Sequence, residues 1–507
     1  MKNPWRMTAG LVIAGAAILS AGQWPSLPYF LDSYYHLSVI QGFREAGGPV
    51  LTSFWESAPA GRPHLYPPLF HLLFLPLSLL NVHPITLARI WCWLSFPLLL
   101  AACWLAFKAV ARERTAALTV MALAAPFSFY LGAVNYLPAT LALIEILGLM
   151  VCLDRKRWLA GGILLGLVFW THLGLSWLTA FSLLLFGLME PTRRKESWKI
   201  LGIGLLVASP WLFHMGHHLE LFEPQPRGEE NYLDTSPLMI LLGLLGLIPA
   251  WRRPFPLSRF LVALAVGFLL MAAGYRFRYF AAQGLFTWLL LAGLFLDRLA
   301  EKGGFRTAGT IGIILLLAAP ALTGSLAERR LRWSWADTTF LSLSAEPRVE
   351  RPYGKSLFNR KHIGELAETL ERQTQPDELF TCNLNYLGGM LHVLTGRAMT
   401  NEMLREMPER SLLEQARWSR ALVWLKAGQG RLTGGKNLRE LTEQEGLQFA
   451  EETETALIFR NPAPDPAGKK RVPAPVLPWW AACGILVVLA GTVIWDFLGG
   501  LNFRKGA

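Results

Sequence analysis

The segment Pro84–Arg114, PITLARIWCWLSFPLLLAACWLAFKAVARER, decides the class of fold. Between residues 86 and 107 its only charged side chain is Arg89, and the segment then ends in the basic run Lys108–Arg114. An apolar stretch of about 20 residues can cross a bilayer as a helix. Lys and Arg beside its end favour the cytoplasmic side. The segment therefore predicts a transmembrane helix whose C-terminal end is cytoplasmic.

The composition of the whole chain agrees with this segment. Of the 507 residues, 53% are hydrophobic and 17% are charged, whereas an average soluble protein has about 25% charged residues. A soluble protein with so little charge could not cover its own surface. The composition also excludes a disordered chain, a collagen, a coiled coil and a disulfide scaffold. We expect an α-helical polytopic membrane protein whose constant partner is the lipid bilayer.

Apolar segments recur along the chain. They lie at residues 7–23, 66–80, 86–107, 115–131, 134–152, 158–170, 174–189, 198–213, 236–250, 258–274, 279–296, 307–323 and 476–499. If all of them crossed the membrane, the basic run 108–114 would lie outside. The segment 66–80 contains Pro67, Pro68 and Pro76, which disfavour a membrane span. We therefore assign it to the first outer loop, residues 24–85, as a helix that does not cross the membrane, and expect about 12 transmembrane helices with both termini cytoplasmic.

The positive charge of the chain follows this topology. The chain has 48 Lys and Arg against 36 Asp and Glu, a net charge of +12. Outside residues 327–473, most basic residues fall in short connections that the topology makes cytoplasmic, such as Arg155–Arg157. This is the charge bias of a membrane protein. Nucleic acid is therefore not expected as a partner.

Three regions follow from the pattern. Residues 1–326 form the membrane region, and residues 474–507 form a last transmembrane helix and a cytoplasmic tail. Residues 327–473 are expected to form a small extracytoplasmic α/β domain, because helix-like and strand-like stretches alternate there. The helix-like stretches are Ile363–Arg372 and Tyr386–Leu394, and the strand-like ones are Glu378–Cys382, Ala421–Leu425 and Thr455–Phe459.

The first outer loop contains the candidate chemistry. Asp32 follows the first span directly, in Asp32-Ser33-Tyr34-Tyr35-His36. A carboxylate at the membrane surface can take a proton from a hydroxyl group or hold a divalent cation. It can equally cap a helix that begins at Ser33. Glu56 is a second carboxylate of this loop, and its position favours a solvated side chain.

Two stretches of this loop resemble known enzymes. Asp32–His36 resembles the first-loop motif of the oligosaccharyltransferase catalytic subunit, and Tyr66-Pro67-Pro68-Leu69 resembles that of the aminoarabinose and protein mannosyltransferases. Together they indicate the GT-C superfamily of membrane glycosyltransferases, and so a GT-C-like fold. The resemblance implies transfer of a sugar from a polyprenyl-phosphate-linked donor to an acceptor outside the cytoplasm. It also implies that Asp32 acts as a catalytic base or as a ligand of Mg²⁺ or Mn²⁺.

The remaining candidate residues are assigned to substrate binding. They are His36, Arg62, His64, Tyr66, Asn135, His172, Arg276 and Arg278. An Arg at an outer membrane edge can bind a phosphate with several donors or extend to lipid head groups. His172, at the outer end of a predicted span, favours a helix cap over a phosphate contact.

Two departures from these families narrow the prediction. Asn135 stands near a position where the relatives often have an acidic residue, which weakens a two-loop metal site. Trp479-Trp480 is followed by Ala481, so the Trp-Trp-Asp signature of oligosaccharyltransferases is absent. This argues against transfer of a whole glycan to protein Asn.

A separate metal candidate lies near the end of the segment 198–213. His214 and His218 are four residues apart and share one helical face, which is a zinc-like spacing, although interfacial histidines are common. Two other functions stay open. One is a transporter or flippase for a polyprenyl-linked glycolipid, and the other is an inactive relative that binds glycolipid. The near absence of charge in the spans favours surface chemistry over transport.

Overall fold

The computed structural model of the chain describes a defined set of residues. They are 3–24, 28, 32–135, 137–221, 235–252, 256–271, 283–301, 312, 322–325, 330–333, 360–401, 403, 415–426, 438, 442–443 and 445–502. Two candidate site residues, Arg276 and Arg278, lie outside this set.

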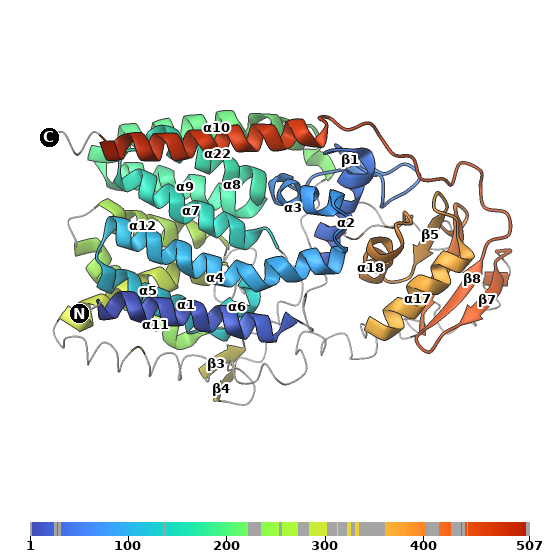
Figure 1. The fold of residues 1–507 in the computed structure, drawn as a ribbon, viewed down its shortest axis with the longest axis horizontal. Coiled ribbons are helices and arrows are strands. Elements are labelled where there is room, and N and C mark those ends of the chain that lie inside the picture. Colours follow the sequence, from blue (N-terminus) through green and yellow to red (C-terminus); the bar gives the residue numbers. More distant parts are fainter. Residues whose placement is uncertain are drawn as a thin grey trace.

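Long helices run side by side along the membrane region (Figure 1). Within the described residues, four helical stretches are long and apolar enough to cross a membrane: Pro4–Gly22, Pro84–Val110, Pro191–His217 and Trp479–Asp496. They correspond to α1 (Pro4–Gly22), α4 (Pro84–Val110), α10 (Arg194–His217) with the preceding 3-10 turn η2 (Pro191–Arg193), and most of α22 (Trp479–Asn502). Residues 84–110 of the segment that decided the fold class thus form one continuous helix, and the total of about 12 helices stays a prediction.

Shorter helices fill the bundle between them. These are α5 (Glu113–Ala124), α6 (Phe127–Ala133), α7 (Ala139–Asp154), α8 (Trp158–Thr171), α9 (Leu173–Met189), α11 (Pro237–Arg252) and α12 (Pro256–Phe268), and the turn η3 (Leu219–Leu221) follows α10. Residues 285–301 are also helical.

Proline moves several of the predicted boundaries. The predicted single helix 115–131 is broken into α5 and α6 at Pro126, and the helix predicted to begin at residue 134 begins after Pro138. Proline has no N–H to donate to the preceding turn. The predicted span 307–323 ends in a strand, because β3 (Leu322–Ser325) pairs antiparallel with β4 (Arg330–Trp333). This hairpin crosses the boundary that the sequence analysis placed at residue 327.

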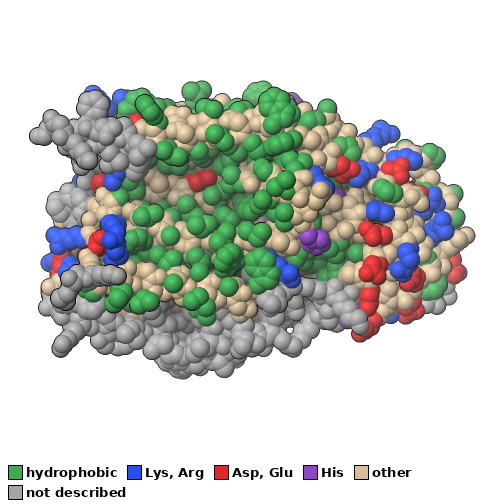
Figure 2. Space-filling view, in the orientation of Figure 1, with side chains coloured by type: hydrophobic (Ala, Val, Ile, Leu, Met, Phe, Trp, Pro, Cys, Tyr) green, Lys and Arg blue, Asp and Glu red, His purple; other side chains and the backbone are tan. Residues whose placement is uncertain are grey.

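The charged connections collect at one end of the bundle. Asn3 at the N-terminus contacts Glu113, and Arg114 forms an ion pair with Asp297 at 2.6 Å. Other pairs at helix ends are Arg157 with Asp496 and Arg259 with Glu190. Figure 2 shows Lys and Arg gathered at this end, with hydrophobic side chains covering the visible face of the helices. The arrangement is the one expected if the basic connections share one side of a membrane.

The first outer loop lies at the opposite end. It folds into α2 (Asp32–Ala46), a short β1–β2 pair (Thr52–Ser53 and Arg62–Pro63) and α3 (Leu69–Leu79). At 11 residues, α3 is about 16 Å long, far short of the ~30 Å hydrocarbon core. A helix within residues 66–80 was predicted for the outer loop, and α3 packs against α2.

A mixed sheet with two helices lies beyond this loop (Figure 1). Its strand order is β5-β6-β8-β7, with β5 parallel to β6 and the other pairs antiparallel. The strands are β5 (Leu379–Cys382), β6 (Ser419–Leu425), β7 (Gln448–Glu452) and β8 (Ala456–Arg460), and the helices are α17 (Arg360–Gln373) and α18 (Asn385–Thr395). The helix-like and strand-like stretches of the sequence lie within one to three residues of these elements.

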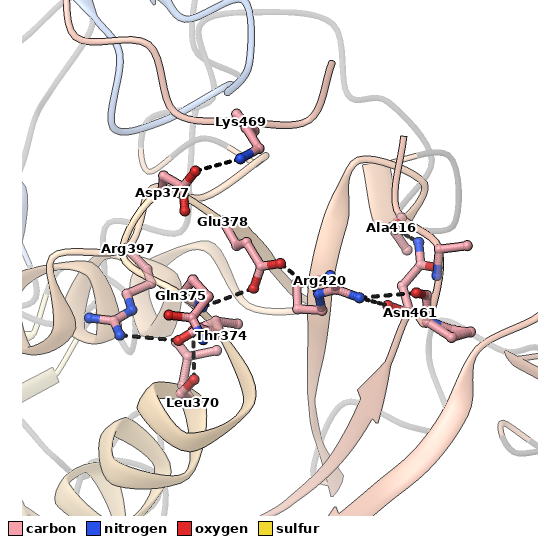
Figure 3. Close-up of polar contacts among 12 residues, drawn as sticks. Leu370, Thr374, Gln375, Asp377, Glu378, Arg397, Ala416, Arg420, Asn461 and Lys469 are labelled. Carbon is pink, nitrogen blue, oxygen red and sulfur yellow. Dashed lines mark hydrogen bonds and ion pairs between the residues drawn. The ribbon is translucent and has the colours of Figure 1, made fainter. Parts of the chain in front are cut away.

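Charged side chains join the connections around this sheet (Figure 3). Glu378 accepts hydrogen bonds from Arg420 Nε at 2.8 Å and from the Gln375 N–H at 2.8 Å. Arg420 also donates to the carbonyl oxygen of Asn461 at 2.9 Å, beyond the end of β8. These contacts fix the start of β5 to both β6 and the segment after β8.

The outer loop and this sheet share a core. The Met399 N–H donates to the Trp55 carbonyl oxygen at 2.9 Å, and the Ala58 N–H donates to the Met399 carbonyl oxygen at 3.1 Å. Buried side chains of α2 and α3 pack in one cluster with those of α17, α18, β5, β6 and β8. The first outer loop is therefore built into the same structural unit as α17, α18 and the four-stranded sheet.

Candidate functional site

Helix α2 carries the first two candidate residues. Asp32 is its first residue and lies in the first turn, where the helix dipole favours a negative charge. His36 follows one turn later, so both side chains lie on one face of the helix. His36 is only 3% exposed. The helix thus places a carboxylate at its N-terminal end with a buried imidazole beneath it.

Helix α3 supplies a partner that the sequence analysis missed. His36 Nδ1 lies 3.0 Å from His71 Nε2, and both rings are buried. The Tyr66 ring contacts both histidines, with its centroid 4.9 Å from that of His36 and 5.9 Å from that of His71. A histidine among the apolar residues that begin α3, one turn after Pro67, was the available signal.

A third histidine extends this group. The ring centroids of His64 and His71 are 6.2 Å apart, and His64 Nδ1 lies 3.1 Å from Ser53 Oγ. We call His36, His64 and His71 the histidine cluster. Burial, which disfavours the charged form, is the main cause that lowers the pKa of all three well below its ordinary value. Neighbouring histidines add to this effect, and so does Arg62 for His64. The cluster is therefore neutral at physiological pH.

Arg62 and Glu56 form a buried ion pair beside this cluster. Arg62 Nη2 lies 3.0 Å from Glu56 Oε1, and the two side chains are 1% and 0% exposed. Glu56 Oε2 accepts a hydrogen bond from the Met403 N–H at 3.0 Å. The expectation of a solvated Glu56 was wrong, because the carboxylate is needed to neutralise Arg62 inside the loop. Arg62 and His64 therefore hold the loop together.

His172 sits at the break between α8 and α9. Its Nδ1 accepts a hydrogen bond from the Leu175 N–H at 3.2 Å, so it caps α9 as the sequence favoured. Because a backbone N–H can only donate, the hydrogen of a neutral His172 must be on Nε2. The ring centroid lies 6.4 Å from that of Tyr66. His172 thus carries an N–H donor at the end of the bundle opposite the basic connections.

Asn135 follows α6, two residues after its end at Ala133. Its side chain is buried, and its Nδ2 donates to the carbonyl oxygen of Leu131 in the last turn of α6. Asn135 Oδ1 has no hydrogen-bond partner among the described residues. The residue therefore stabilises the helix end and leaves one acceptor atom in the interior.

The described residues give little support for a metal site. His214 Nε2 lies 2.9 Å from the His64 carbonyl oxygen, so this nitrogen is engaged with the backbone. The rings of His214 and His218 meet edge to face at 5.2 Å. Within the described ranges, no group of three or more His, Cys, Asp and Glu side chains could hold a metal ion.

The site thus combines three chemical features at the end of the bundle opposite the basic connections. Asp32 offers a carboxylate, the histidine cluster offers a neutral polar floor, and His172 offers a hydrogen-bond donor. The sheet with α17 and α18 covers the loop that bears Asp32 and His36. This arrangement suits proton removal and binding of an anion where a bilayer meets water.

Comparison with solved structures identifies similar folds. No family model and no curated sequence matches the chain. The structure of ArnT from Cupriavidus metallidurans bound to undecaprenyl phosphate is similar, with a TM-score of 0.55 and 14% identity over 92% of this chain and 100% of that one. The oligosaccharyltransferase of Archaeoglobus fulgidus in complex with Zn and sulfate has a TM-score of 0.53 and 11% identity, over 89% of this chain and 73% of that one.

A further structure of the archaeal enzyme is also similar. AglB from Archaeoglobus fulgidus, in complex with an inhibitory peptide and a dolichol-phosphate, has a TM-score of 0.52 and 12% identity, over 83% of this chain and 70% of that one. Both neighbours are GT-C glycosyltransferases. The chain described here has the GT-C fold, as its first outer loop suggested.

Proposed function

We propose that this protein is a GT-C glycosyltransferase that moves a sugar from a polyprenyl-phosphate-linked donor to an acceptor on the extracytoplasmic face of the cell membrane. One observation carries the proposal. Within a GT-C fold, three separate stretches of sequence bring Asp32 and His36, Tyr66, and His172 to one end of the bundle. The neighbouring ArnT and AglB structures contain undecaprenyl phosphate and dolichol-phosphate, which supports a donor of that class.

The proposed orientation follows from charge. The end of the bundle that carries the basic connections is cytoplasmic, together with both termini. Residues 327–473 are then an extracytoplasmic α/β domain, and about 12 helices cross the membrane. The site faces the outer leaflet, where the phosphate of a polyprenyl donor lies at the surface and its tail lies in the lipid.

Asp32 is the proposed catalytic base. Its carboxylate accepts the proton of the acceptor hydroxyl, and the resulting oxygen attacks the anomeric carbon of the donor. The bond between this carbon and the phosphate oxygen breaks, and polyprenyl phosphate leaves with the electron pair. A positioned base contributes about 10²–10⁴-fold to such a step.

The departing phosphate needs donors. We assign His172 Nε2–H, Arg276 and Arg278 to it, because charge-assisted hydrogen bonds are strongest where negative charge develops. Tyr66 and His36 form the wall between the phosphate and the sugar, and Asn135 Oδ1 is an acceptor for a sugar hydroxyl. Arg62 and His64 act by shaping the loop that holds Asp32.

A divalent cation does not fit the described donor set. Asn135 replaces the second carboxylate that a two-loop site would use, and His214 is engaged by the His64 carbonyl oxygen. Each proposed step therefore uses side chains of the chain itself.

Purified protein in lipid nanodiscs tests the function. It should release polyprenyl phosphate from at least one member of a panel of polyprenyl-phosphate-linked sugars when an acceptor glycolipid is present. Asp32→Asn should lower the rate by ~100-fold or more with unchanged folding, since Asn preserves a helix cap. A fully active Asp32→Asn protein would show that Asp32 only caps α2. A wild-type protein that is inactive on the whole panel would favour the inactive glycolipid-binding relative.

A further inference from the structure

A buried carboxyl group contacts Thr171, the residue directly before His172. Glu145, in the middle of α7, is 8% exposed, and its Oε1 lies 2.9 Å from Thr171 Oγ1. Its Oε2 has no hydrogen-bond partner among the described residues. An acidic side chain inside an apolar helix bundle is costly and usually has a role.

The single hydroxyl hydrogen of Thr171 limits the protonation state of the Glu145 carboxyl group. Thr171 Oγ1 also lies 2.8 Å from the Leu167 carbonyl oxygen, one turn earlier in α8. A hydroxyl group has a single hydrogen to donate, and a carbonyl oxygen can only accept. If Glu145 were ionised, the two acceptors would compete for that hydrogen. Each contact has a hydrogen of its own when Glu145 is a neutral acid that donates to Thr171 Oγ1, while Thr171 donates to the Leu167 carbonyl oxygen.

We infer that Glu145 is a neutral carboxylic acid and a positioning residue, which braces the end of α8 through Thr171 and thereby orients His172. The inference rests on the proposed function for His172. Thr171 is the last residue of α8, and His172 adopts the extended backbone that separates α8 from α9. A bond from α7 to Thr171 fixes where this break occurs. The break in turn sets the direction of the ring Nε2–H of His172.

Chemical labelling tests the neutral state without any activity. Dicyclohexylcarbodiimide adds to a carboxylic acid in apolar surroundings: the acid proton moves to a carbodiimide nitrogen, the carboxyl oxygen bonds to the central carbon, and the adduct rearranges to a stable N-acylurea. Mass spectrometry of the full chain in nanodiscs should find Glu145 modified at pH 7.5, and the Glu145→Gln protein should lack this adduct. Modification at pH 5 but not at pH 7.5 would overturn the inference.

Enzyme kinetics test the positioning role. Glu145→Gln keeps an N–H that can donate to Thr171, so the KM for the polyprenyl-linked sugar donor should not change. Glu145→Leu should raise this KM about tenfold, the loss expected for one hydrogen bond. His172→Asn keeps the cap but removes the Nε2–H, so adding Glu145→Leu to it should cause no further rise. The positioning role would be refuted if Glu145→Gln raised the KM as much as Glu145→Leu. It would also be refuted if the effects of His172→Asn and Glu145→Leu multiplied in the double variant. If the wild type transfers no sugar, the proposed function fails, and the labelling experiment still decides the state of Glu145.

Discussion

The buried Glu56–Arg62 pair gives a sharp prediction about how the outer loop is held. Glu56→Ala would leave the Arg62 guanidinium, 1% exposed, without its carboxylate and the Met403 N–H without its acceptor. Removing one partner of a buried pair costs about 3–5 kcal/mol, because an uncompensated charge stays in the interior. We expect this cost to weaken the attachment of the loop to Met399 and Met403.

Hydrogen exchange measures this cost where it acts. The backbone N–H groups of Met399 and Ala58 bridge the loop and the late segment, so their exchange reports local opening. A loss of about 3 kcal/mol or more should raise their exchange rates by about 100-fold or more. The matched control is Glu451→Ala, which breaks the pair between Glu451, 36% exposed, and Arg372, 57% exposed. This loss should cost about 0.2–1 kcal/mol. Equal exchange in the two variants would refute the reasoning.

Three further predictions concern stability and topology. The histidine cluster is neutral in the folded protein, whereas histidines of the unfolded chain take up protons below pH ~6.5. The free energy of unfolding should therefore fall as the pH drops from about 6.5 to 5, by up to roughly 1.4 kcal/mol per pH unit for each histidine. A flat pH profile in denaturant titrations would contradict this. Gly246→Ala would drive a methyl group into the Leu291 backbone and should cost about 1–3 kcal/mol, whereas Gly202→Ala, with open space around it, should be neutral or stabilising in the same titrations. A membrane-impermeant maleimide added to intact cells should label Asp465→Cys and spare Arg112→Cys, and labelling of the latter would reject the proposed topology.

Local signals in the sequence predicted much of the architecture. The length of the apolar segment and the charges beside it predicted α4. The helix-like stretch 386–394 predicted α18 to within about a residue at each end. Boundaries failed where a single residue outweighed hydropathy, as at Pro126, where the loss of one backbone donor splits a predicted helix. Hydropathy averaged over a window does not register such a loss.

Long-range pairing explains what the sequence could not show. Glu56 seemed a solvated loop residue, because its contact with Met403 joins positions 347 residues apart. His71 escaped notice because its hydrogen bond to His36 depends on how α3 packs against α2. Asp32, His36, Tyr66 and His172 were identified from motifs or positions, yet their arrangement around one end of the bundle required the fold.

The glycolipid and glycan profile of a strain that lacks this protein tests the central claim most directly. The account predicts that one extracytoplasmic glycoconjugate loses a sugar and that the unmodified polyprenyl-linked donor accumulates. Wild-type protein should restore the profile, and Asp32→Asn, expressed at the same level, should not. An unchanged profile in the deletion strain, or full restoration by Asp32→Asn, would contradict it.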